Sequence, residues 1–355
     1  MRIGIDIQSI TGKLSGIGFY TKNLLQHLKS IDSENEYIPI FDKFFQGNLS
    51  TYKRVVWEQI ILPSKLYTEK IDILHIPGFS PPLIKNCRLA LTLHDLIGVR
   101  IPENNLSLFS RLYWGKYLPI LAKTVDIIIT VSQHSKYDIM ELLKIDEKNI
   151  VVIYLAAGKE FRVINDEEGI KNVKIKYNIA ENPYVLYVGN IEYRKNLFRL
   201  VKVWESLSIP YKLVIVGSKT KFSEMLMKYI VEKNLKKRIV LTGYVPINDL
   251  VLLYNGASLF VYPSLYEGFG LPVIEAMSCG VPVVTSNTSA LPEVVGDAGI
   301  MVNPLNSEEL QSAIIKVLTD NVLHRNLRKK GLERAKMFSW EKTAKETLKV
   351  YKMLM

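Results

Sequence analysis

The sequence predicts an α/β protein made of two doubly wound, Rossmann-like domains that face each other, each with a parallel sheet between layers of helices. Short, strongly apolar segments alternate with helical patterns along nearly the whole chain, and this alternation breaks once before it resumes. Apolar strands separated by helices are typical of parallel sheets that are covered on both faces. A length of 355 residues also suits two domains of ordinary size.

Six apolar segments predict the strands of the first domain, which we place at residues 1–165. Helical patterns lie between them, for example over residues 21–31 and 135–143. The six segments are RIGIDI, YIPIF, ILHIP, LALTLHDL, DIIITVS and NIVVIYL.

Six further segments predict a second domain of the same kind over residues 178–337. The charged stretch 161–180 separates the two series and is interpreted as a linker. The last segment, 338–355, repeats apolar residues at helical spacing, which predicts an amphipathic helix that could pack on either domain. The six segments of the second series are YVLYVGN, YKLVIVG, RIVLTGYV, SLFVYPS, PVVTS and GIMVN.

The composition is that of an ordinary globular protein, with 48% apolar and 23% charged residues. No apolar run approaches the roughly 18 residues that a membrane-spanning helix needs, and the N-terminal residues lack the pattern of a signal peptide. The two cysteines, Cys87 and Cys279, form no CxxC motif, and the five histidines show no metal-ligand spacing. We therefore expect a cytoplasmic protein with neither a disulfide framework nor a metal centre.

The net charge of +11 is concentrated in the second half of the chain. Residues 1–170 hold 20 Lys and Arg against 19 Asp and Glu, whereas the remainder holds 26 against 16. Such an excess indicates anionic partners, which could be nucleotides, nucleic acid or acidic lipid headgroups. For the basic run 325–336, a solvated helix face is the preferred explanation.

The segment YEGFGLPVIEA combines two carboxylates, two glycines and a proline-initiated helix. Glu267 and Glu275 lie eight positions apart around Gly268 and Gly270. The glycines let backbone amides approach a ligand closely, and the helix start offers N–H groups to an anion. Carboxylates repel phosphate but accept hydrogen bonds from sugar hydroxyls. A nucleotide sugar has hydroxyl-bearing rings on both sides of its phosphates and fits this combination; a loop with solvated glutamates is the alternative.

Two adjacent cations follow the first predicted strand of the second domain. Arg194 and Lys195 come after a glycine turn and before a helix, where like charges are unfavourable unless an anion lies nearby. A diphosphate would supply that anion, and two solvated surface cations are the alternative. Gly243, Tyr244 and Val245 follow another strand, and their backbone could contact a nucleobase, although this signal alone is weak.

In the first half, the strand LALTLHDL ends in His94, which could hydrogen-bond a sugar hydroxyl or a phosphate oxygen. A satisfied structural histidine is the main alternative, and a metal role together with His75 is a minor one. The loop after the first strand contains Gly12, Gly16 and Gly18 before a helix. Its spacing fits neither the dinucleotide fingerprint nor the P-loop, but it suits a close backbone approach to a ligand.

These residues together resemble the retaining glycosyltransferases of the GT-B fold, in the large family four. The resemblance covers almost the whole chain and is most specific around Glu267 and Glu275, which match the family's Glu-x7-Glu motif, and at Arg194 and Lys195. The stretches SGIGFYTKNLL, LTLHDL and TVSQHSKYDI look like the mannosyltransferase branch. The final helix resembles the family's C-terminal helix, which returns to the first domain.

The matching positions imply roles for the site residues. Glu267 would bind hydroxyls of the donor sugar beside the reacting carbon, and His94 would also contact that sugar. Glu275 would bind the ribose hydroxyls, while Arg194 and Lys195 would neutralise the departing diphosphate. The other donor-binding positions would supply mainly backbone contacts: Gly16, Gly189, Gly243, Tyr244, Val245, Gly268, Phe269, Gly270 and Leu271.

One position departs from the family pattern, because many members have an arginine directly after the glycine of the diphosphate loop, where this chain has Asn190. A clamp of three cations is therefore not expected here. The chain also lacks a convincing Asp-x-Asp metal motif, which agrees with a clamp made of side chains. No enzymic nucleophile is assigned.

We therefore expect a metal-independent retaining glycosyltransferase without a further cofactor. It would move a hexose, preferably mannose from GDP-mannose, onto a glycan or lipid-linked glycan. A transferase that uses a UDP-sugar and a nucleotide-sugar 2-epimerase of the same fold remain alternatives. A nucleic-acid-binding protein is a remote one, because the chain has no recognition-helix or RRM-type motif; no nucleic-acid partner is expected.

The segment 106–123 interleaves aromatic and basic residues, which suits a bilayer interface or a lipid-linked acceptor. The alternative is an ordinary helix that packs its aromatic side chains inward. The nearly neutral first half argues against strong electrostatic anchoring. We expect weak peripheral binding at the inner face of the membrane at most, carried by Phe109, Tyr113, Trp114, Tyr117, Arg111, Lys116 and Lys123 together with the basic second domain.

Overall fold

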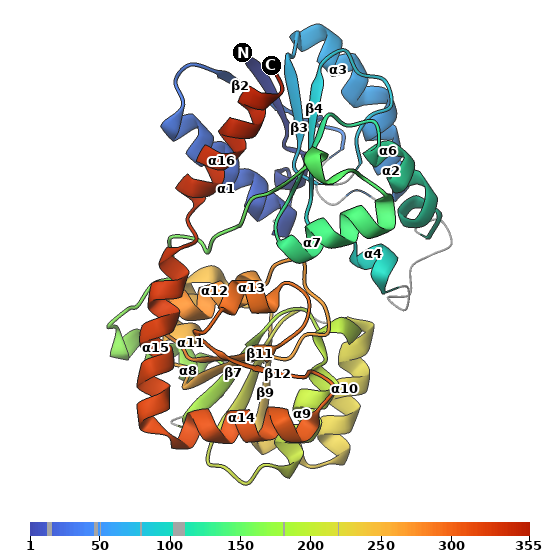
Figure 1. Cartoon of the computed structure of the whole chain (residues 1–355). Helices are drawn as coiled ribbons and strands as arrows, with labels where there is room; N and C mark the ends of the chain where they lie inside the picture. The colour runs from blue at the N-terminus through green and yellow to red at the C-terminus, as the bar shows by residue number, and fades with distance from the viewer. Residues whose placement is uncertain are drawn as a thin grey trace. The chain divides into compact units, whose positions relative to one another are not determined.

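The computed structural model describes residues 1–12, 16–45, 49, 51–78, 80–101, 111–179, 182–218 and 220–355. The chain divides into two compact units (Figure 1). Unit 1 comprises Met1–Leu155 and Ser339–Met355, and unit 2 comprises Ala156–Phe338. The C-terminal segment thus belongs to the same unit as the N-terminal half.

Unit 1 is built on a six-stranded sheet of order β2-β1-β3-β4-β5-β6, in which all strand pairings are parallel. The order reverses between β1 and β3, the point at which open α/β sheets bind ligands beyond their carboxyl ends. The strands are β1 (Arg2–Asp6), β2 (Glu36–Ile40), β3 (Ile73–Ile76), β4 (Arg88–Leu93), β5 (Ile127–Thr130) and β6 (Ile150–Val152).

The helices of unit 1 include three π-helical segments, η2, η3 and η4, each continuous with an α-helix. π-Helical turns inside helices are rare and occur often at functional sites. The helical elements are η1 (Gln8–Ile10), α1 (Gly16–Ile31), α2 (Thr51–Val56), η2 (Trp57–Ile61), α3 (Leu62–Glu69), α4 (Ile97–Arg100), η3 (Tyr113–Tyr117), α6 (Leu118–Ala122), α7 (Gln133–Asp138), η4 (Ile139–Leu143), η5 (Glu147–Asn149) and α16 (Trp340–Met353).

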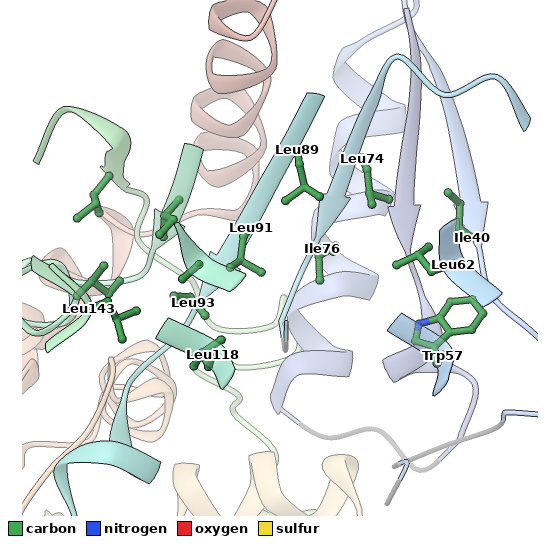
Figure 2. Packing of buried hydrophobic residues seen from close by; sticks show 14 of the residues in the cluster. Ile40, Trp57, Leu62, Leu74, Ile76, Leu89, Leu91, Leu93, Leu118 and Leu143 are labelled. Atoms are coloured by element: carbon green, nitrogen blue, oxygen red, sulfur yellow. The ribbon is translucent and has the colours of Figure 1, made fainter. Parts of the chain in front are cut away.

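One face of this sheet packs against η2, α3, α6 and η4 in an apolar core (Figure 2). Successive strand residues point to opposite faces, so Leu89, Leu91 and Leu93 of β4 all enter this core, which also contains Trp57 and Leu118. Each fully buried Leu of this kind contributes about 1.5–3 kcal/mol relative to an exposed one.

The opposite face is covered by α1 and α16, which lie alongside each other (Figure 1). A buried hydrogen-bonded chain fixes α16 there. His75 of β3 bonds the Tyr351 hydroxyl through Nδ1 at 2.6 Å and Thr92 Oγ1 through Nε2 at 2.7 Å, and Thr92 bonds the Tyr20 hydroxyl at 3.1 Å. Polar groups inside a core are stable when they satisfy one another in this way.

Unit 2 contains a second parallel sheet, of order β12-β11-β10-β7-β8-β9, which reverses between β7 and β10. Its strands are β7 (Tyr184–Val188), β8 (Lys212–Val216), β9 (Ile239–Gly243), β10 (Leu259–Tyr262), β11 (Val283–Ser286) and β12 (Ile300–Val302). Its helical elements are α8 (Glu167–Lys176), η6 (Tyr193–Lys195), α9 (Leu197–Ser206), α10 (Lys221–Glu232), η7 (Leu235–Lys237), α11 (Ile247–Asn255), α12 (Leu271–Ser278), α13 (Leu291–Val295), α14 (Ser307–Thr319) and α15 (Asn321–Lys336).

The twelve predicted strands and the two-unit α/β fold are confirmed. The interpretation of residues 161–180 as a linker is wrong in part, because α8 occupies the middle of that stretch. Asp166 caps this helix by accepting a hydrogen bond from the Gly169 amide at 2.8 Å. The helix was not predicted because Val173 is its one buried residue, which leaves little apolar periodicity.

Residues 156–165 lie in unit 2, although the sequence placed them with the first half. The contacts of this segment explain the difference. Asn255 of α11 donates to the Arg162 carbonyl and accepts from the Ile164 amide at 2.8 Å, and Phe161 packs edge-on against Tyr254.

Candidate active site

The predicted site residues of unit 2 gather where its strand order reverses. Arg194 and Lys195 lie in η6, just after β7, and Glu267 lies in the loop after the neighbouring strand β10. Because β7 and β10 pair in parallel, their carboxyl ends meet at the same edge of the sheet. This is the position at which α/β sheets of this kind bind ligands.

Glu267 is the centre of a buried ion cluster. Its Oε1 accepts from Lys195 Nζ at 2.6 Å and from Ser264 Oγ at 2.5 Å, and its Oε2 accepts from Arg194 Nη1 at 2.9 Å. Arg194 Nε also donates to Glu192 at 3.0 Å. The cations expected to bind a diphosphate are therefore held by carboxylates.

This cluster sets the charge state of its carboxylate. Burial by itself raises the pKa of Glu267, but the charges of Lys195 and Arg194 and the hydrogen bonds from Lys195 and Ser264 outweigh it and lower the pKa to about 2. Burial lowers the pKa of Lys195, while the Glu267 charge acts in the opposite direction. Glu267 is thus ionised throughout the physiological range.

The backbone after Glu267 is shaped by Gly270 and by the start of α12. Gly270 has φ +115° at the N-cap, and a Cβ there would approach Leu291 to 2.8 Å, so this position requires glycine. Leu271 and Pro272 form the first turn of α12, as the sequence predicts. Phe269 is buried against Phe338 with ring centroids 5.9 Å apart. Gly268 is also buried.

Glu275 has separate surroundings, because its carboxylate accepts from the Tyr254 hydroxyl at 2.9 Å and not from the cations that hold Glu267. Burial raises the pKa of Glu275 to about 7, the Tyr254 hydrogen bond opposes this rise, and the charge of Glu160 adds to it. The two glutamates of the Glu-x7-Glu motif therefore differ in charge state: one is firmly ionised and the other titrates near neutrality.

The remaining predicted positions of unit 2 follow its other strands. Gly189 comes directly after β7 with φ +153°, and Gly243 ends β9 with φ +73° and no atom of the described residues within 4 Å of an added Cβ. Next to it, Tyr244 is 64% exposed and Val245 is buried. This turn therefore combines a glycine in the left-handed region with an exposed aromatic side chain.

In unit 1, His94 follows β4 and is partly buried. Its Nε2 lies 2.8 Å from the Pro77 carbonyl oxygen, so Nε2 carries the proton and Nδ1 is the acceptor. Burial lowers the pKa of His94, against the opposing effects of the Pro77 carbonyl and Asp95, and the ring is therefore neutral at neutral pH. Gly16 opens α1, with no described atom within 4 Å of an added Cβ.

A metal role for His75 and His94 is wrong, because both nitrogens of His75 are bonded to hydroxyl groups. Burial lowers the pKa of His75 to about 3, which keeps the ring neutral. The residues that the structure describes contain no group of three His, Cys, Asp or Glu side chains placed to hold a metal ion.

Sequence reasoning missed the neighbours that hold the predicted residues. Ser264, fully buried, and the Tyr262 hydroxyl, which accepts from Lys195 Nζ, complete the Glu267 cluster. Ser289 Oγ accepts from the Glu267 amide at 3.0 Å, and Tyr254 holds Glu275. The one available signal was that Tyr262 and Ser264 stand at the end of a predicted strand, beside the motif.

Two family models match the chain and together span both units. The glycosyl transferases group 1 model matches residues 170–334, and the Glycosyltransferase Family 4 model matches residues 16–157. The chain is 36% identical over 286 residues to the O-antigen chain mannosyltransferase B of Escherichia coli, a match that covers 79% of this chain and 74% of that protein. This chain belongs to the group 1 glycosyltransferases of family 4 and is a glycosyltransferase.

Two further comparisons agree with this assignment. The serotype-specific mannosyltransferase WbdA of Escherichia coli is 33% identical over 71% of this chain, which spans only 32% of that longer protein. The Anabaena protein HepE, solved in complex with UDP and glucose, superposes with a TM-score of 0.79 over 100% of both chains at 18% identity. The latter likeness establishes the GT-B fold.

Exchanging Glu267 for Gln should destabilise the protein in a pH-dependent way, since it removes one partner of a buried ion cluster. We expect a loss of about 3 kcal/mol in the free energy of unfolding at pH 7. The folded-state pKa lies below the usual 4.5, so the stabilisation by Glu267 is complete above pH 4.5 and is lost as the pH falls towards 2.

Urea unfolding at several pH values tests this prediction. The pH range of roughly 2.5 to 8 covers the titration of carboxyl groups. The control is Glu192→Gln, whose side chain is 32% exposed and accepts from Arg194 Nε at 3.0 Å; it should cost less than about 1 kcal/mol. If the difference in unfolding free energy between the wild type and Glu267→Gln does not shrink at acid pH, the assigned charge state of Glu267 is contradicted.

Proposed function

We propose that this glycosyltransferase transfers a hexose with retention of configuration and without a metal ion, and that its donor is GDP-mannose. The buried Glu267–Arg194–Lys195 cluster at the sheet reversal of unit 2 carries this proposal. It combines an ionised carboxylate, which can accept hydrogen bonds from sugar hydroxyls, with two cations, which can neutralise a diphosphate. A glycan or lipid-linked glycan would be the acceptor.

The chemical step depends above all on stabilising the leaving group, because the nucleoside diphosphate departs with its negative charge. Preorganised cations stabilise that charge as it develops. Arg194 and Lys195 are already oriented by Glu267, so the diphosphate would share or replace carboxylate contacts instead of ordering loose side chains. This arrangement avoids the entropy cost of fixing two long side chains when the donor binds.

The other site residues have supporting roles in this proposal. Glu267 would bind donor-sugar hydroxyls, and His94 would accept from a sugar hydroxyl through Nδ1. Glu275 would bind the ribose hydroxyls. Backbone contacts to the sugar, phosphates and base would come from Gly16, Gly189, Gly243, Tyr244, Val245, Gly268, Phe269, Gly270 and Leu271.

The mannose assignment rests on the relatives, whose names include O-antigen mannosyltransferases. HepE was solved with UDP and glucose, so a UDP-sugar is the competing donor. A screen of GDP-mannose, UDP-glucose, UDP-GlcNAc and UDP-galactose by thermal shift and slow donor hydrolysis separates these donors. Proton NMR of the transfer product reports its anomeric configuration. Conversion of the donor without an acceptor into a second nucleotide sugar would identify a 2-epimerase instead.

Exchanging Lys195 for Ala should lower kcat/KM by more than about tenfold, since a charge-assisted contact is worth roughly 1.5–3 kcal/mol and each 1.4 kcal/mol is about tenfold. The double exchange with Arg194 should cost more, and EDTA should leave wild-type activity unchanged. Lys202→Ala, an exposed cation on the adjacent helix α9, is the control and should have no effect. Strict dependence on Mg²⁺ or Mn²⁺ would refute the metal-independent clamp.

The two glutamates should separate nucleotide binding from turnover. Glu275→Gln should weaken GDP binding about tenfold or more, because a ribose hydroxyl loses a charged acceptor. In the wild type, affinity should fall as the pH drops below about 7, where Glu275 becomes protonated, and this dependence should vanish in the variant. Glu267→Ala should lose turnover but still bind GDP.

Titration calorimetry with GDP tests whether nucleotide binding depends on Glu275 and not on Glu267. It is carried out at pH 6 and pH 8, about one pH unit on either side of neutrality. Because the folded-state pKa of Glu275 is raised, the carboxylate destabilises the free protein progressively between pH 4.5 and about 7. Glu275→Gln should therefore have a higher melting temperature than the wild type at pH 8. Equal loss of GDP binding in both glutamate variants would contradict the assigned roles.

We also propose weak peripheral binding of unit 1 to anionic membranes, at the cytoplasmic face. Residues 106–110, which include Phe109, lie outside the described residues. Tyr113 and Trp114 turn inward, Tyr113 being 4% exposed, so the aromatic residues are not a continuous interfacial stripe. Instead, an apolar hollow of about 410 Å³ opens beside exposed Leu112 and Ile120. Its lining is Val55, Leu112, Tyr113, Lys116, Tyr117 and Ile120.

Exposed cations accompany this hollow. Lys116 lines it, and Arg111 and Lys123 are exposed on the same segment. Exposed apolar side chains with cations on the same segment suit an interface with acidic headgroups, where each cation contributes about 1 kcal/mol to binding. The helices of the described residues include none that is long and apolar enough to cross a bilayer.

Co-sedimentation with liposomes should show binding that rises with the fraction of anionic lipid and falls with salt. Exchanging both Leu112 and Ile120 for Glu should abolish it. Ile175→Glu on unit 2 is the matched control, because Ile175 is 60% exposed and Ile120 is 63% exposed. A protein that remains in the supernatant with fully anionic vesicles at low salt has no membrane affinity of this kind.

A further inference from the structure

The segment that follows β3 is held by two consecutive side chains of the π-helical turn η2. Glu58 accepts from the Ser80 amide at 3.2 Å through Oε1, and its Oε2 lies 2.5 Å from Ser80 Oγ. Gln59 donates to the Pro81 carbonyl at 3.0 Å and accepts from the Leu83 amide at 2.9 Å. Four hydrogen bonds thus join η2 to residues 80–83.

The inner part of this contact is completely enclosed. Glu58 is 2% exposed and Ser80 is fully buried. Ser80 Oγ also bonds the Tyr113 hydroxyl at 2.8 Å, which adds the π-helical turn η3 to the same network. Two rare π-turns therefore meet at one serine, and that serine follows β3, beside the point where the strand order of unit 1 reverses.

The same segment begins with the group that orients His94. The Pro77 carbonyl accepts from His94 Nε2 at 2.8 Å and so selects the tautomer whose Nδ1 is the acceptor. A Cβ on the next residue, Gly78, would approach Ile17 of α1 to 2.9 Å, so the backbone here is packed tightly against α1. Pro77 and Ser80 are thus three positions apart in one short segment, whose described residues contact α1 at Gly78 and η2 at Ser80.

We propose that Glu58 and Gln59 are positioning residues for His94: they fix the segment after β3, and the Pro77 carbonyl in turn fixes the tautomer and direction of the His94 ring. This inference rests on the proposed role of His94 as a contact of the donor sugar. The alternative is that the two residues stabilise unit 1 without affecting His94.

Glu58 acts in this network as a neutral group. Burial raises its pKa to about 8, the hydrogen bonds from Ser80 and the charge of Arg54 oppose the rise, and the charge of Asp6 adds to it. The groups that face it are Ser80, Tyr113, Arg54 and Asp6. Gln is therefore a close substitute at this position: its amide oxygen accepts from the Ser80 amide, and its NH₂ donates to Ser80 Oγ once that hydroxyl donates to the Tyr113 hydroxyl instead.

The test compares Glu58→Ala, Glu58→Gln and Gln59→Ala by two readouts. The first is the side-chain ¹⁵N NMR spectrum of histidine, which distinguishes Nε2–H from Nδ1–H tautomers; the chain has five histidines, and His94→Asn assigns the signal. The second is donor hydrolysis, separated into kcat and KM. Leu143→Ala, a core truncation in η4 away from the segment, controls for stability loss alone.

We expect Glu58→Ala to shift or broaden the His94 signal. It should also lower kcat about tenfold or more, which corresponds to the loss of one hydrogen bond to a charged or reacting group. The KM for the donor should change by no more than about threefold, as for the loss of a single weak contact. Glu58→Gln should restore both readouts. Gln59 is only partly buried, so Gln59→Ala should fold and show a smaller change in the same direction even if Glu58→Ala does not fold.

The histidine spectrum separates this inference from the proposed function. If the wild type transfers no hexose but the His94 signal still follows Glu58, the donor assignment fails and the positioning stands. If the wild type is active and the His94 signal and kcat are unchanged in the Glu58→Ala and Gln59→Ala variants, or change equally in Leu143→Ala, then the positioning role is wrong.

Discussion

A single buried carboxylate, that of Glu267, determines how the proposed nucleotide-sugar site of this glycosyltransferase is built. Lys195 is almost fully buried, and a lone buried ammonium group would be strongly unfavourable. Glu267 at 2.6 Å compensates it and orients Arg194 at 2.9 Å. The cluster exists because β7 and β10 are neighbours, so the loops that follow them meet. The strand order, the glycine at the start of α12 and the buried Ser264 all place this carboxylate.

Beside its predicted site residue His94, unit 1 has neutral hydrogen-bond networks, whereas the site of unit 2 has a buried ion cluster. His75 joins α16 to the sheet through Tyr351, and the Glu58–Ser80–Tyr113 network ties two π-helical turns to the segment beside His94. Both networks contain groups whose pKa values are shifted towards the neutral form, downward for His75 and upward for Glu58. Burying a titratable group without a counter-ion costs less free energy when the group is neutral.

The fold could be predicted from the sequence because the buried parallel strands are predominantly apolar runs separated by turns and helical patterns. Helix α8 could not be predicted, since it has a single buried residue, Val173. The charged residues at its start were interpreted as part of a linker. At the site, Glu267, Arg194 and Lys195 were found because each follows a predicted strand. The pairing of these residues with one another could not be predicted, because it depends on which strands are neighbours. Local apolar patterns do not specify strand order. The inward packing of Tyr113 was one of two alternatives that the sequence left open, because its partner Ser80 is distant in the sequence.

We propose that the donor's diphosphate and sugar bind at the Glu267 cluster. A crystal structure of the protein with GDP-mannose, or with GDP alone if the donor is hydrolysed, tests it directly. We predict phosphate oxygens about 2.7–3.2 Å from Arg194 and Lys195, and ribose hydroxyls within the same distance range of the Glu275 carboxylate. Phosphates bound elsewhere, with the Glu267 ion pairs unchanged and out of reach of the nucleotide, would contradict it.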